Sequence, residues 1–486
     1  MVAHFLRHPR HALALALLLQ ILLFVVGQQD MPPDDPLYYA EFARDIAKDP
    51  AAAFGMASTY PWHMRIGLTL PLALLYRVFG VSTLVTNLPC LFAAIGILCV
   101  VYVAAPTPRA KVFAMLLAAT CAPLARHAAT LNVDLPCAAL LACSTLWLSW
   151  RDRPRWLAAA MAVWFAAFLV KETAIWGAPI WAYAIISDLR SSSLRAVVRR
   201  YAPAVAIGAA LSLGYLALCA ALWGDPFARF RGIQDLTYAH GWTMHDKSSG
   251  EWFARLVWGP PLMMFKMFRG LLVPAVLAIW LVRGRDAIWG VATLAMVGLF
   301  WFGSSSATAY EPLPLWPRMI LPALPFLLVV SAIAADRGLD RLTRGRSAAV
   351  IVMLVVLAVP ATMMYVGQIR RDRSESTAFA MLRADLSDPA QTVVLVCGDR
   401  WFPTLARFHF GFAPPPNLLI IGADEVATRA LPDRAVVRAI VDVARSAPIP
   451  DVEKIEALHL RPLFSQQHLR LYAVDDVAAL RAALHP

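Results

Sequence analysis

Long apolar segments alternate with short arginine-rich loops along most of this chain, and this alternation limits the folds that the chain can adopt. Apolar runs such as 12–27, 81–105, 201–222 and 347–367 approach the ~20 residues that an α-helix needs to cross a bilayer. Charged residues make up 16% of the 486 residues, whereas a soluble protein carries roughly 25%. The sequence therefore predicts a polytopic helical membrane protein.

The basic residues are concentrated in the loops of one side. The net charge is +12, and the loops that we assign to the cytoplasm hold 17 Lys or Arg and 5 Asp, which is the whole net charge. Such an excess in cytoplasmic loops follows the positive-inside rule, and it argues against a patch that binds nucleic acid. These loops are residues 1–10, 105–111, 151–155, 188–200, 283–286 and 336–346.

The alternation predicts an all-α transmembrane bundle of about eleven helices within residues 1–367, with the N-terminus in the cytoplasm. We interpret residues 12–27 as an uncleaved first span, because no small-residue cleavage site follows them and many more spans come after. The expected spans are 12–27, 81–105, 111–126, 135–150, 156–170, 173–187, 201–222, 270–282, 287–303, 319–335 and 347–367.

Two long loops are expected on the outer side of the membrane, which in a bacterial cell is the periplasm. The first, residues 28–80, contains an amphipathic stretch at Leu37–Ala47 and an apolar stretch at Ile66–Phe79. Both stretches are typical of helices that lie on a membrane surface. The second loop, residues 223–269, is rich in Trp, His and Pro.

The composition changes after residue 367. Apolar runs at Thr392–Cys397, Leu418–Gly422 and Leu469–Val474 alternate with helix-like segments such as Ser376–Leu386. This pattern predicts a small periplasmic α/β domain over residues 368–486.

Asp34 and Asp35 form a doubled carboxylate in the first outer loop, and Tyr38 follows them. One Asp could cap the helix expected at Leu37–Ala47. A cap needs only one carboxylate, however, and the second adds repulsion. Two adjacent carboxylates suit a general base that activates a hydroxyl, with a neighbour that tunes its pKa or holds a cation.

The Asp-Asp-x-x-Tyr motif after a first span resembles the signature of the polytopic C-type (GT-C) glycosyltransferases. The resemblance is greatest to the dolichyl- or polyprenyl-phosphate-mannose-protein mannosyltransferases, the lipid A aminoarabinose transferase and the galacturonosyltransferases of lipopolysaccharide core. Met319 stands where the family usually has Tyr. The other segments that agree in order, within residues 10–367, are Arg65-Ile-Gly67, Asn132-Val-Asp134, Leu169-Val-Lys171-Glu172 and Arg318-Met-Ile-Leu-Pro322.

The resemblance implies an inverting membrane glycosyltransferase. Its donor would be a polyprenyl-phosphate-linked monosaccharide, and its acceptor a hydroxyl of lipid A or lipopolysaccharide, another envelope glycan or a protein. Asp34 or Asp35 would be the catalytic base. The expected location is the cytoplasmic (inner) membrane of the cell, and the expected partners are the lipid-linked sugar, the cell-envelope acceptor and the bilayer.

Three cations at outer ends of spans are candidates for binding the donor phosphate: Arg65, Lys171 and Arg318. The alternative for each is a side chain that reaches lipid headgroups. Further substrate-binding candidates are Tyr38, His63, Asp134 and Glu172. Asp134 could instead cap the helix that follows it.

The sequence leaves a divalent metal ion open as a cofactor. His63, His240, His245 and Asp246 are candidate ligands, but their spacing is unspecific and ordinary interfacial histidines explain them as well. The seven Cys have neither zinc-site spacing nor the pattern of a disulfide framework.

Two rival functions remain at this stage. A transporter or lipid flippase should show repeated halves and charged or broken segments near the bilayer midplane. In this chain the charges instead cluster at outer ends of spans, which favours an enzyme. A catalytically inactive relative that serves as an assembly subunit is the other alternative.

Overall fold

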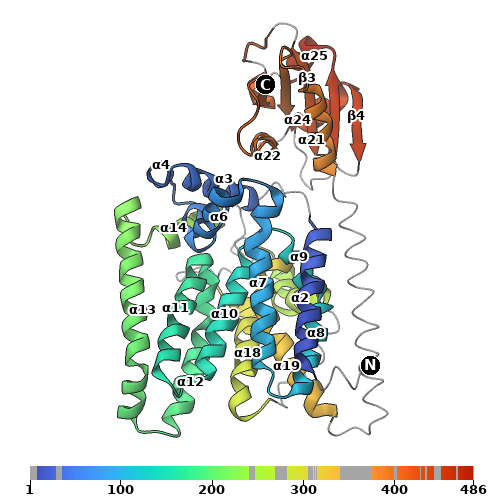
Figure 1. Cartoon of the computed structure of the whole chain (residues 1–486). Coiled ribbons are helices and arrows are strands. Elements are labelled where there is room, and N and C mark those ends of the chain that lie inside the picture. The colour runs from blue at the N-terminus through green and yellow to red at the C-terminus, as the bar shows by residue number, and fades with distance from the viewer. Residues whose placement is uncertain are drawn as a thin grey trace. The chain divides into compact units, whose positions relative to one another are not determined.

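The computed structural model of the chain is mostly helical and carries one small β-sheet (Figure 1). It forms two compact units, of which the first comprises residues 1–27, 49–71 and 87–366 and the second residues 28–48, 72–86 and 367–486. The structure describes residues 8–28, 35–239, 247–268, 282–304, 310, 312, 315–339, 374–398, 402–426, 428–432, 435–442, 450–466 and 469–484.

Nine bundle helices in the described part of the chain coincide with predicted spans. The predicted spans at 270–282 and 347–367 lie outside the described residues. Three helices are long and apolar enough to cross a membrane, and α18 and α19 also are when the 3-10 turns that precede them are included. The nine are α2 (Pro9–Val26), α7 (Thr83–Ala104), α8 (Pro108–Ala119), α10 (Asp134–Ser149), α11 (Pro154–Val170), α12 (Ala178–Leu189), α13 (Leu194–Trp223), α18 (Ala287–Phe302) and α19 (Leu324–Leu339).

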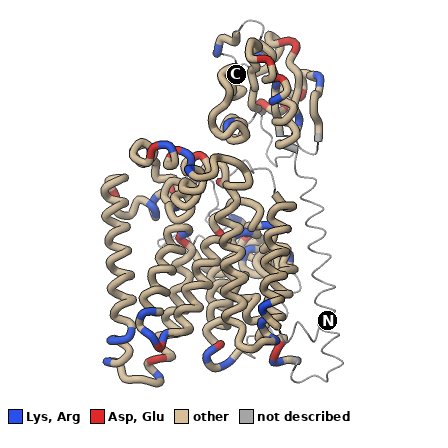
Figure 2. The backbone as a smooth tube through the Cα atoms, viewed as in Figure 1, with Lys and Arg blue, Asp and Glu red and all other residues tan. Residues whose placement is uncertain are grey.

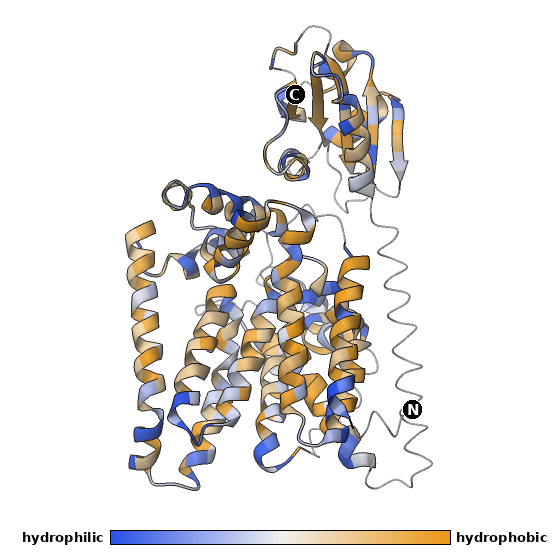
Figure 3. Ribbon diagram, viewed as in Figure 1, coloured by the Kyte–Doolittle hydropathy of each residue, from blue (hydrophilic) through white to orange (hydrophobic). Residues whose placement is uncertain are grey.

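Local sequence signals explain where several of these helices begin and end. Proline occupies the first turn of α2, α8 and α11, where its missing N–H costs nothing. The Thr107 hydroxyl accepts the Ala110 N–H and caps α8, and α13 ends at Gly224 with φ +69. Apolar residues then run along α2, α7 and α13, and α2 and α13 are more hydrophilic in their first turns (Figure 3). The bundle is thus that of a membrane protein.

Small residues allow the central helices to pack closely. Ala138 and Ala142 of α10 are fully buried, as is Ala160 of α11. The Ser144 hydroxyl of α10 donates to the Ala160 carbonyl at 2.8 Å. Small side chains and hydroxyl bonds of this kind are how helices associate within a bilayer.

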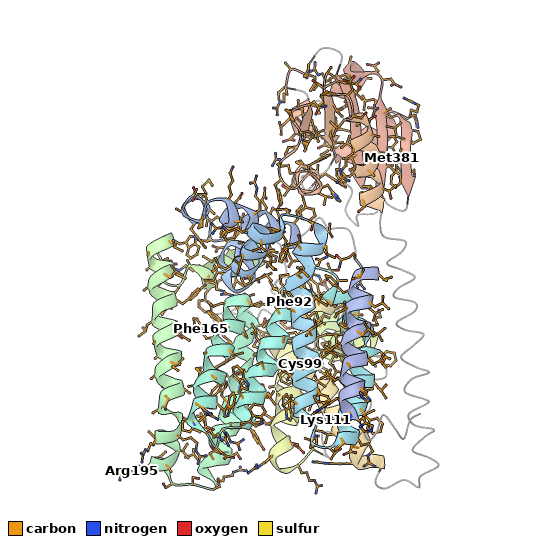
Figure 4. All side chains as sticks on the ribbon, in the orientation of Figure 1. Phe92, Cys99, Lys111, Phe165, Arg195 and Met381 are labelled. Carbon is orange, nitrogen blue, oxygen red and sulfur yellow. The ribbon has the colours of Figure 1, made fainter. Side chains whose placement is uncertain are left out.

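The arginine-rich loops gather at one end of the bundle (Figure 2). Lys111 and Arg195, which come from two of the predicted cytoplasmic loops, both lie toward that end (Figure 4). Buried Asp188 accepts hydrogen bonds from Arg151 and Arg200 there. The described parts of the loops that the sequence assigns to one side of the membrane therefore lie at the same end of the bundle.

Short elements within the first unit connect the other ends of the bundle helices. They are α4 (Pro50–Gly55), α5 (Pro61–Met64), the first turns of α6 (Ile66–Phe79), α9 (Ala122–Ala128), η1 (Glu172–Gly177), α14 (Ala228–Ala239), α15 (Ser249–Phe253), η2 (Ala254–Trp258), α16 (Gly259–Phe268) and η5 (Pro317–Ala323).

The second unit contains a five-stranded sheet in the order β2-β1-β3-β5-β4. β1 is parallel to β2 and β3, whereas β5 is antiparallel to both β3 and β4. The strands are β1 (Val393–Cys397), β2 (Leu418–Gly422), β3 (Val436–Asp442), β4 (Arg461–Gln466) and β5 (Leu469–Val474). The helices are α21 (Ser374–Asp385), α22 (Phe402–His409), α23 (Ala423–Val426), α24 (Pro450–Ala457) and α25 (Val477–Leu484).

The predicted α/β character of this region is confirmed, and the sequence indicated β1, β2, β5 and α21. The second unit also includes α3 (Asp35–Lys48) from the first predicted outer loop. The predicted helices at Leu37–Ala47 and Ile66–Phe79 are confirmed as α3 and α6.

Candidate functional site

A two-point ion pair joins the first loop to the end of α11. Arg65 lies between α5 and α6, and Glu172 is the first residue of η1. The Arg65 Nη2 donates to Glu172 Oε1 at 2.6 Å and its Nε donates to Oε2 at 3.3 Å. Side chains bonded at two points keep a fixed direction. Two predicted site residues that are 107 positions apart in the chain are therefore brought together.

Arg229 of α14 is a second guanidinium on the same carboxylate. Its Nη2 donates to Glu172 Oε2 at 3.3 Å, and its guanidinium carbon lies 4.5 Å from the centre of the Phe168 ring. The side chain is 1% exposed. Our reading of the sequence did not single out Arg229. The available signal was an arginine between the aromatic residues Phe227 and Phe230, just after a predicted span.

Two glycines permit the close approach of these segments. A Cβ on Gly67 would lie 2.6 Å from the Val170 backbone nitrogen, so only glycine lets the start of α6 pack against the end of α11. A Cβ on Gly232 would lie 1.9 Å from the Thr59 carbonyl oxygen. The first contact brings Arg65 to Glu172, and the second fixes α14 beside the loop that precedes α5.

Lys171 and Asp134 form a second, deeper ion pair. The ammonium of Lys171 donates to Asp134 Oδ1 and to the Met319 Sδ, the latter at 3.1 Å. Lys171 is 3% exposed, which does not fit a side chain that reaches lipid headgroups. Asp134 is not the helix cap, because the Asn132 Oδ1 accepts the Leu135 N–H at 2.9 Å in that role.

Arg318 lies on η5, next to the methionine that contacts Lys171. Its guanidinium carbon lies 5.1 Å from the centre of the Trp316 ring. Arg65, Lys171 and Arg318 come from distant parts of the sequence, and they belong to one set of linked segments: the loop before α6, the tip between α11 and η1, and η5.

The charges of this set, here called the cation cluster (Arg65, Lys171, Arg229 and Arg318), change the proton affinity of its neighbours. Burial alone would raise the pKa of Glu172, but the guanidinium groups of Arg65 and Arg229 outweigh it and hold that pKa well below its ordinary value. Glu172 is therefore ionised at any physiological pH.

His127 of α9 is a further titratable neighbour that the sequence reading did not single out. Burial is the main cause that lowers the pKa of His127 to about 4, and the charges of Arg126 and Arg318 add to it. The imidazole is therefore neutral near pH 7. The only sequence signal was an Arg-His pair in a predicted outer turn.

The candidate catalytic carboxylates lie at the start of α3. Asp35 is the first residue of that helix, where the helix dipole favours a negative charge. Tyr38 is three residues further on, on the neighbouring helix surface. Asp34 lies outside the described residues.

His63 of α5 has a local partner. Its Nδ1 accepts the Ser58 N–H at 3.0 Å, so the neutral ring carries its proton on Nε2. The other candidate metal ligands, His240, His245 and Asp246, lie outside the described residues. Within the described parts of the chain, no group of three His, Cys, Asp or Glu could hold a metal ion, and we derive no step through one.

Residues 67–217 match the model of the family described as dolichyl-phosphate-mannose-protein mannosyltransferase. A comparison with curated protein sequences finds no significant match.

Solved structures match over nearly the whole chain. ArnT from Cupriavidus metallidurans bound to undecaprenyl phosphate has a TM-score of 0.60 and 16% sequence identity, over 96% of this chain and 98% of that one. The Archaeoglobus fulgidus oligosaccharyltransferase in complex with Zn and sulfate has a TM-score of 0.53 and 13% identity, over 89% and 68%. The arabinofuranosyltransferase AftD from Mycobacteria has a TM-score of 0.50 and 15% identity, over 96% and 41%.

These matches confirm the resemblance that the sequence motifs indicated. The chain has the fold of the GT-C membrane glycosyltransferases, with a helical bundle and a small C-terminal α/β region.

Proposed function

We propose that this chain, which has the GT-C fold, transfers a monosaccharide from a polyprenyl-phosphate donor to a hydroxyl group of a cell-envelope acceptor. One observation carries the proposal. Arg65 binds Glu172, which adjoins Lys171, and Lys171 contacts Met319, which adjoins Arg318. Three distant segments that each carry a cation are therefore linked, which supports binding of a lipid phosphate. Arg229 adds a fourth cation to the cluster.

The reaction would be a single displacement at the anomeric carbon. The acceptor oxygen forms a bond to that carbon while the bond from carbon to the phosphate oxygen breaks, and its electron pair leaves with the phosphate. The acceptor proton passes to Asp34 or Asp35, and attack from the opposite face inverts the configuration. The acceptor would be lipid A or lipopolysaccharide, another envelope glycan or a protein.

The cation cluster would stabilise the departing phosphate. Positive groups that are already in place lower the energy of a developing negative charge without reorganising at the moment of reaction. The two-point bond to Glu172 gives Arg65 such a fixed position. Asp134 would hold Lys171, and Tyr38 and His63 would contact the sugar or the acceptor.

The solved relatives support this choice of donor. ArnT has been solved with undecaprenyl phosphate, and the matched family is described by its use of dolichyl-phosphate mannose. Undecaprenyl phosphate and dolichyl-phosphate mannose both carry a phosphate on a long isoprenoid chain.

The catalytic test compares three Asp→Asn variants in the same loop region. Asp34→Asn and Asp35→Asn should each lower transfer by ~10²–10⁴, the usual loss for a missing general base, with unchanged yield of folded protein. Asp49→Asn is the control, because Asp49 caps α4 by accepting the Ala51 and Ala52 N–H groups and Asn caps equally well.

The first step identifies the envelope lipid or glycan that lacks one sugar in cells without the protein. Each variant is then expressed in these cells, and the amount of the complete lipid or glycan is measured. Near-normal complementation by the Asp34→Asn/Asp35→Asn double variant would refute the mechanism. It would instead favour an assembly subunit with no catalysis of its own.

We further propose that the N-terminus is cytoplasmic and that residues 368–486 lie outside the inner membrane, on the basis of the loop charges. A reporter that is active only in the periplasm should be active when fused after Pro486. Activity of a cytoplasmic reporter at that position would overturn this orientation.

A further inference from the structure

α3, the helix that begins at Asp35, belongs to the same compact unit as the C-terminal α/β domain. It packs against α22 of that domain. Its buried residues include Leu37, Tyr39 and Phe42. A segment of the first outer loop is therefore part of a unit whose other main component lies more than 300 residues further along the chain.

The turn after α22 has an unusual backbone conformation. Phe412 has φ +59, in the left-handed region, which costs free energy for a residue with a large side chain. Its N–H donates to the Arg407 carbonyl at 2.6 Å, and its ring meets the Phe408 ring edge to face at 5.8 Å. Residues are held in such conformations where the surrounding structure determines them, and these positions often have a functional role.

Arg44 of α3 binds this turn directly. Its Nη2 donates to the Phe412 carbonyl oxygen at 3.0 Å, and its guanidinium carbon lies 5.6 Å from the centre of the Phe412 ring. One side chain thus makes a charge-assisted hydrogen bond and a cation–π contact with a single residue.

Two further contacts hold the same helix. Burial and the charge of Asp45 raise the pKa of Glu41 on α3, and the guanidinium of Arg407 on α22 acts in the opposite direction, so the two side chains lie within electrostatic range. The Arg77 Nε donates to the Ala47 carbonyl at 2.8 Å at the last turn of α3. The carboxyl-terminal half of α3 is therefore held from two sides, and a rigid helix transmits that position to its first residue.

We propose that the C-terminal α/β domain positions Asp35, the candidate catalytic carboxylate at the start of α3, by holding α3 through the contact between Arg44 and Phe412. The inference rests on the proposed glycosyl transfer and gives the α/β domain a role in it. Arg44 is a positioning residue in this scheme, because it lies on α3 and contacts the turn after α22 rather than the substrate.

The chain offers a matched control within the α/β domain. The Arg383 Nη2 donates to the His409 carbonyl at 2.7 Å, and its guanidinium carbon lies 5.5 Å from the centre of the Phe410 ring. These are the same two kinds of contact at the same turn, but they join α21 to the end of α22 and do not involve α3. Arg44 in addition pairs with Asp45 of its own helix at 2.5 Å. Arg44→Ala and Arg383→Ala therefore remove like contacts with different consequences.

The experiment measures hydrogen exchange and kinetics on the full-length protein. Arg44→Ala should speed amide exchange of residues 35–48 about tenfold or more and lower kcat about tenfold, with the KM for the lipid donor changed by less than about twofold. Arg383→Ala should leave both kcat and the exchange of residues 35–48 unchanged. Arg44→Lys keeps the charge but not the planar fork, and should fall between Arg44→Ala and wild type.

If residues 35–48 of Arg44→Ala exchange their amide hydrogens at the wild-type rate, the contact of Arg44 does not hold α3. Faster exchange with unchanged kcat would overturn its role in positioning, and equal effects of Arg44→Ala and Arg383→Ala would attribute both to general loss of stability. Because exchange is measured without substrate, a failure of the proposed transfer reaction is distinguished from a failure of the docking.

Discussion

Glu172→Gln is the sharpest test of the cation cluster. The substitution keeps the shape of the side chain and removes the charge that accepts three hydrogen bonds from Arg65 and Arg229. Removing one partner of a buried ion pair typically costs about 3–5 kcal/mol. Glu172 is 18% exposed, so we expect a loss of about 2–4 kcal/mol in the free energy of unfolding.

Repulsion between the two guanidinium groups contributes to this loss. At a separation of about 5 Å and an effective dielectric constant of about 20, two like charges repel by about 3 kcal/mol. Removing one of them should therefore restore stability. We expect Glu172→Gln/Arg229→Gln to unfold at a higher temperature than Glu172→Gln alone, although Arg229→Gln on its own should be destabilising.

The assay is thermal unfolding in detergent together with donor kinetics. For a chain of this size, about 2–4 kcal/mol corresponds to a fall in Tm of roughly 2–4 °C. The kcat/KM for the donor should fall at least about tenfold, because Arg65 loses its fixed position. Glu425→Gln is the control, since it removes a carboxylate from an exposed pair with Arg429 that contributes less than about 1 kcal/mol.

The pH dependence of the stability difference tests whether the charge of Glu172, rather than the packing of its side chain, provides the stabilisation. The pKa of Glu172 is depressed in the folded state, so its stabilisation is complete above the unfolded pKa of about 4.3 and is lost as the pH falls further. The Tm difference between wild type and Glu172→Gln should be constant from about pH 6 to 8 and narrow below about pH 4. A Tm difference between wild type and Glu172→Gln that shrinks between about pH 6 and 8 would refute the reasoning. Additive effects of Glu172→Gln and Arg229→Gln on stability would refute it as well.

Three further predictions concern the same region. Arg65→Lys and Arg318→Lys should each lower donor kcat/KM by roughly ten- to a hundredfold in transfer assays, whereas side chains that only reach lipid headgroups would accept either cation. Gly67→Ala should lower the free energy of unfolding by about 1–3 kcal/mol and remove most of the transfer activity, because the added Cβ would meet the backbone of α11. Gly214→Ala, which has open space around it, should change neither thermal unfolding nor transfer activity. The pKa of His127 is lowered to about 4 in the folded state, below its unfolded value near 6.5. Wild type should therefore lose stability relative to His127→Gln as the pH falls from about 7 to 4, and a Tm difference between the two proteins that does not change with pH would contradict this.

The helical bundle could be predicted from the sequence because its determinants are local. An apolar run of bilayer length, with arginines at one end, specifies a helix and its direction without reference to any other segment. The same holds for the amphipathic helix α3 and for the buried strands β1, β2 and β5. The strand β4 was missed because Arg461–Gln466 is a polar edge strand with a proline, and its pairing with β5 depends on the sheet.

The sequence also determined which residue types stand at the ends of the predicted spans, and its motifs indicated the GT-C fold. It did not determine their partners. The bond from Arg65 to Glu172 and the burial of Lys171 against Asp134 and Met319 depend on how separate segments pack. That packing is set by steric contacts such as the one at Gly67, which no periodicity in the chain reveals.

Tertiary structure alone identified Arg229 and the contact of Arg44 with Phe412. Arg229 follows a predicted span, so the sequence alone is compatible with a contact to lipid headgroups. Its carboxylate partner Glu172 lies 57 positions away in the chain and is identified only by the folded structure. The contact of α3 with α22 joins residues 368 positions apart. Hydrophobic pattern acts over a few turns of one helix, whereas ion pairs and backbone contacts act over a few ångströms of space, and only the folded chain decides which residues share that space.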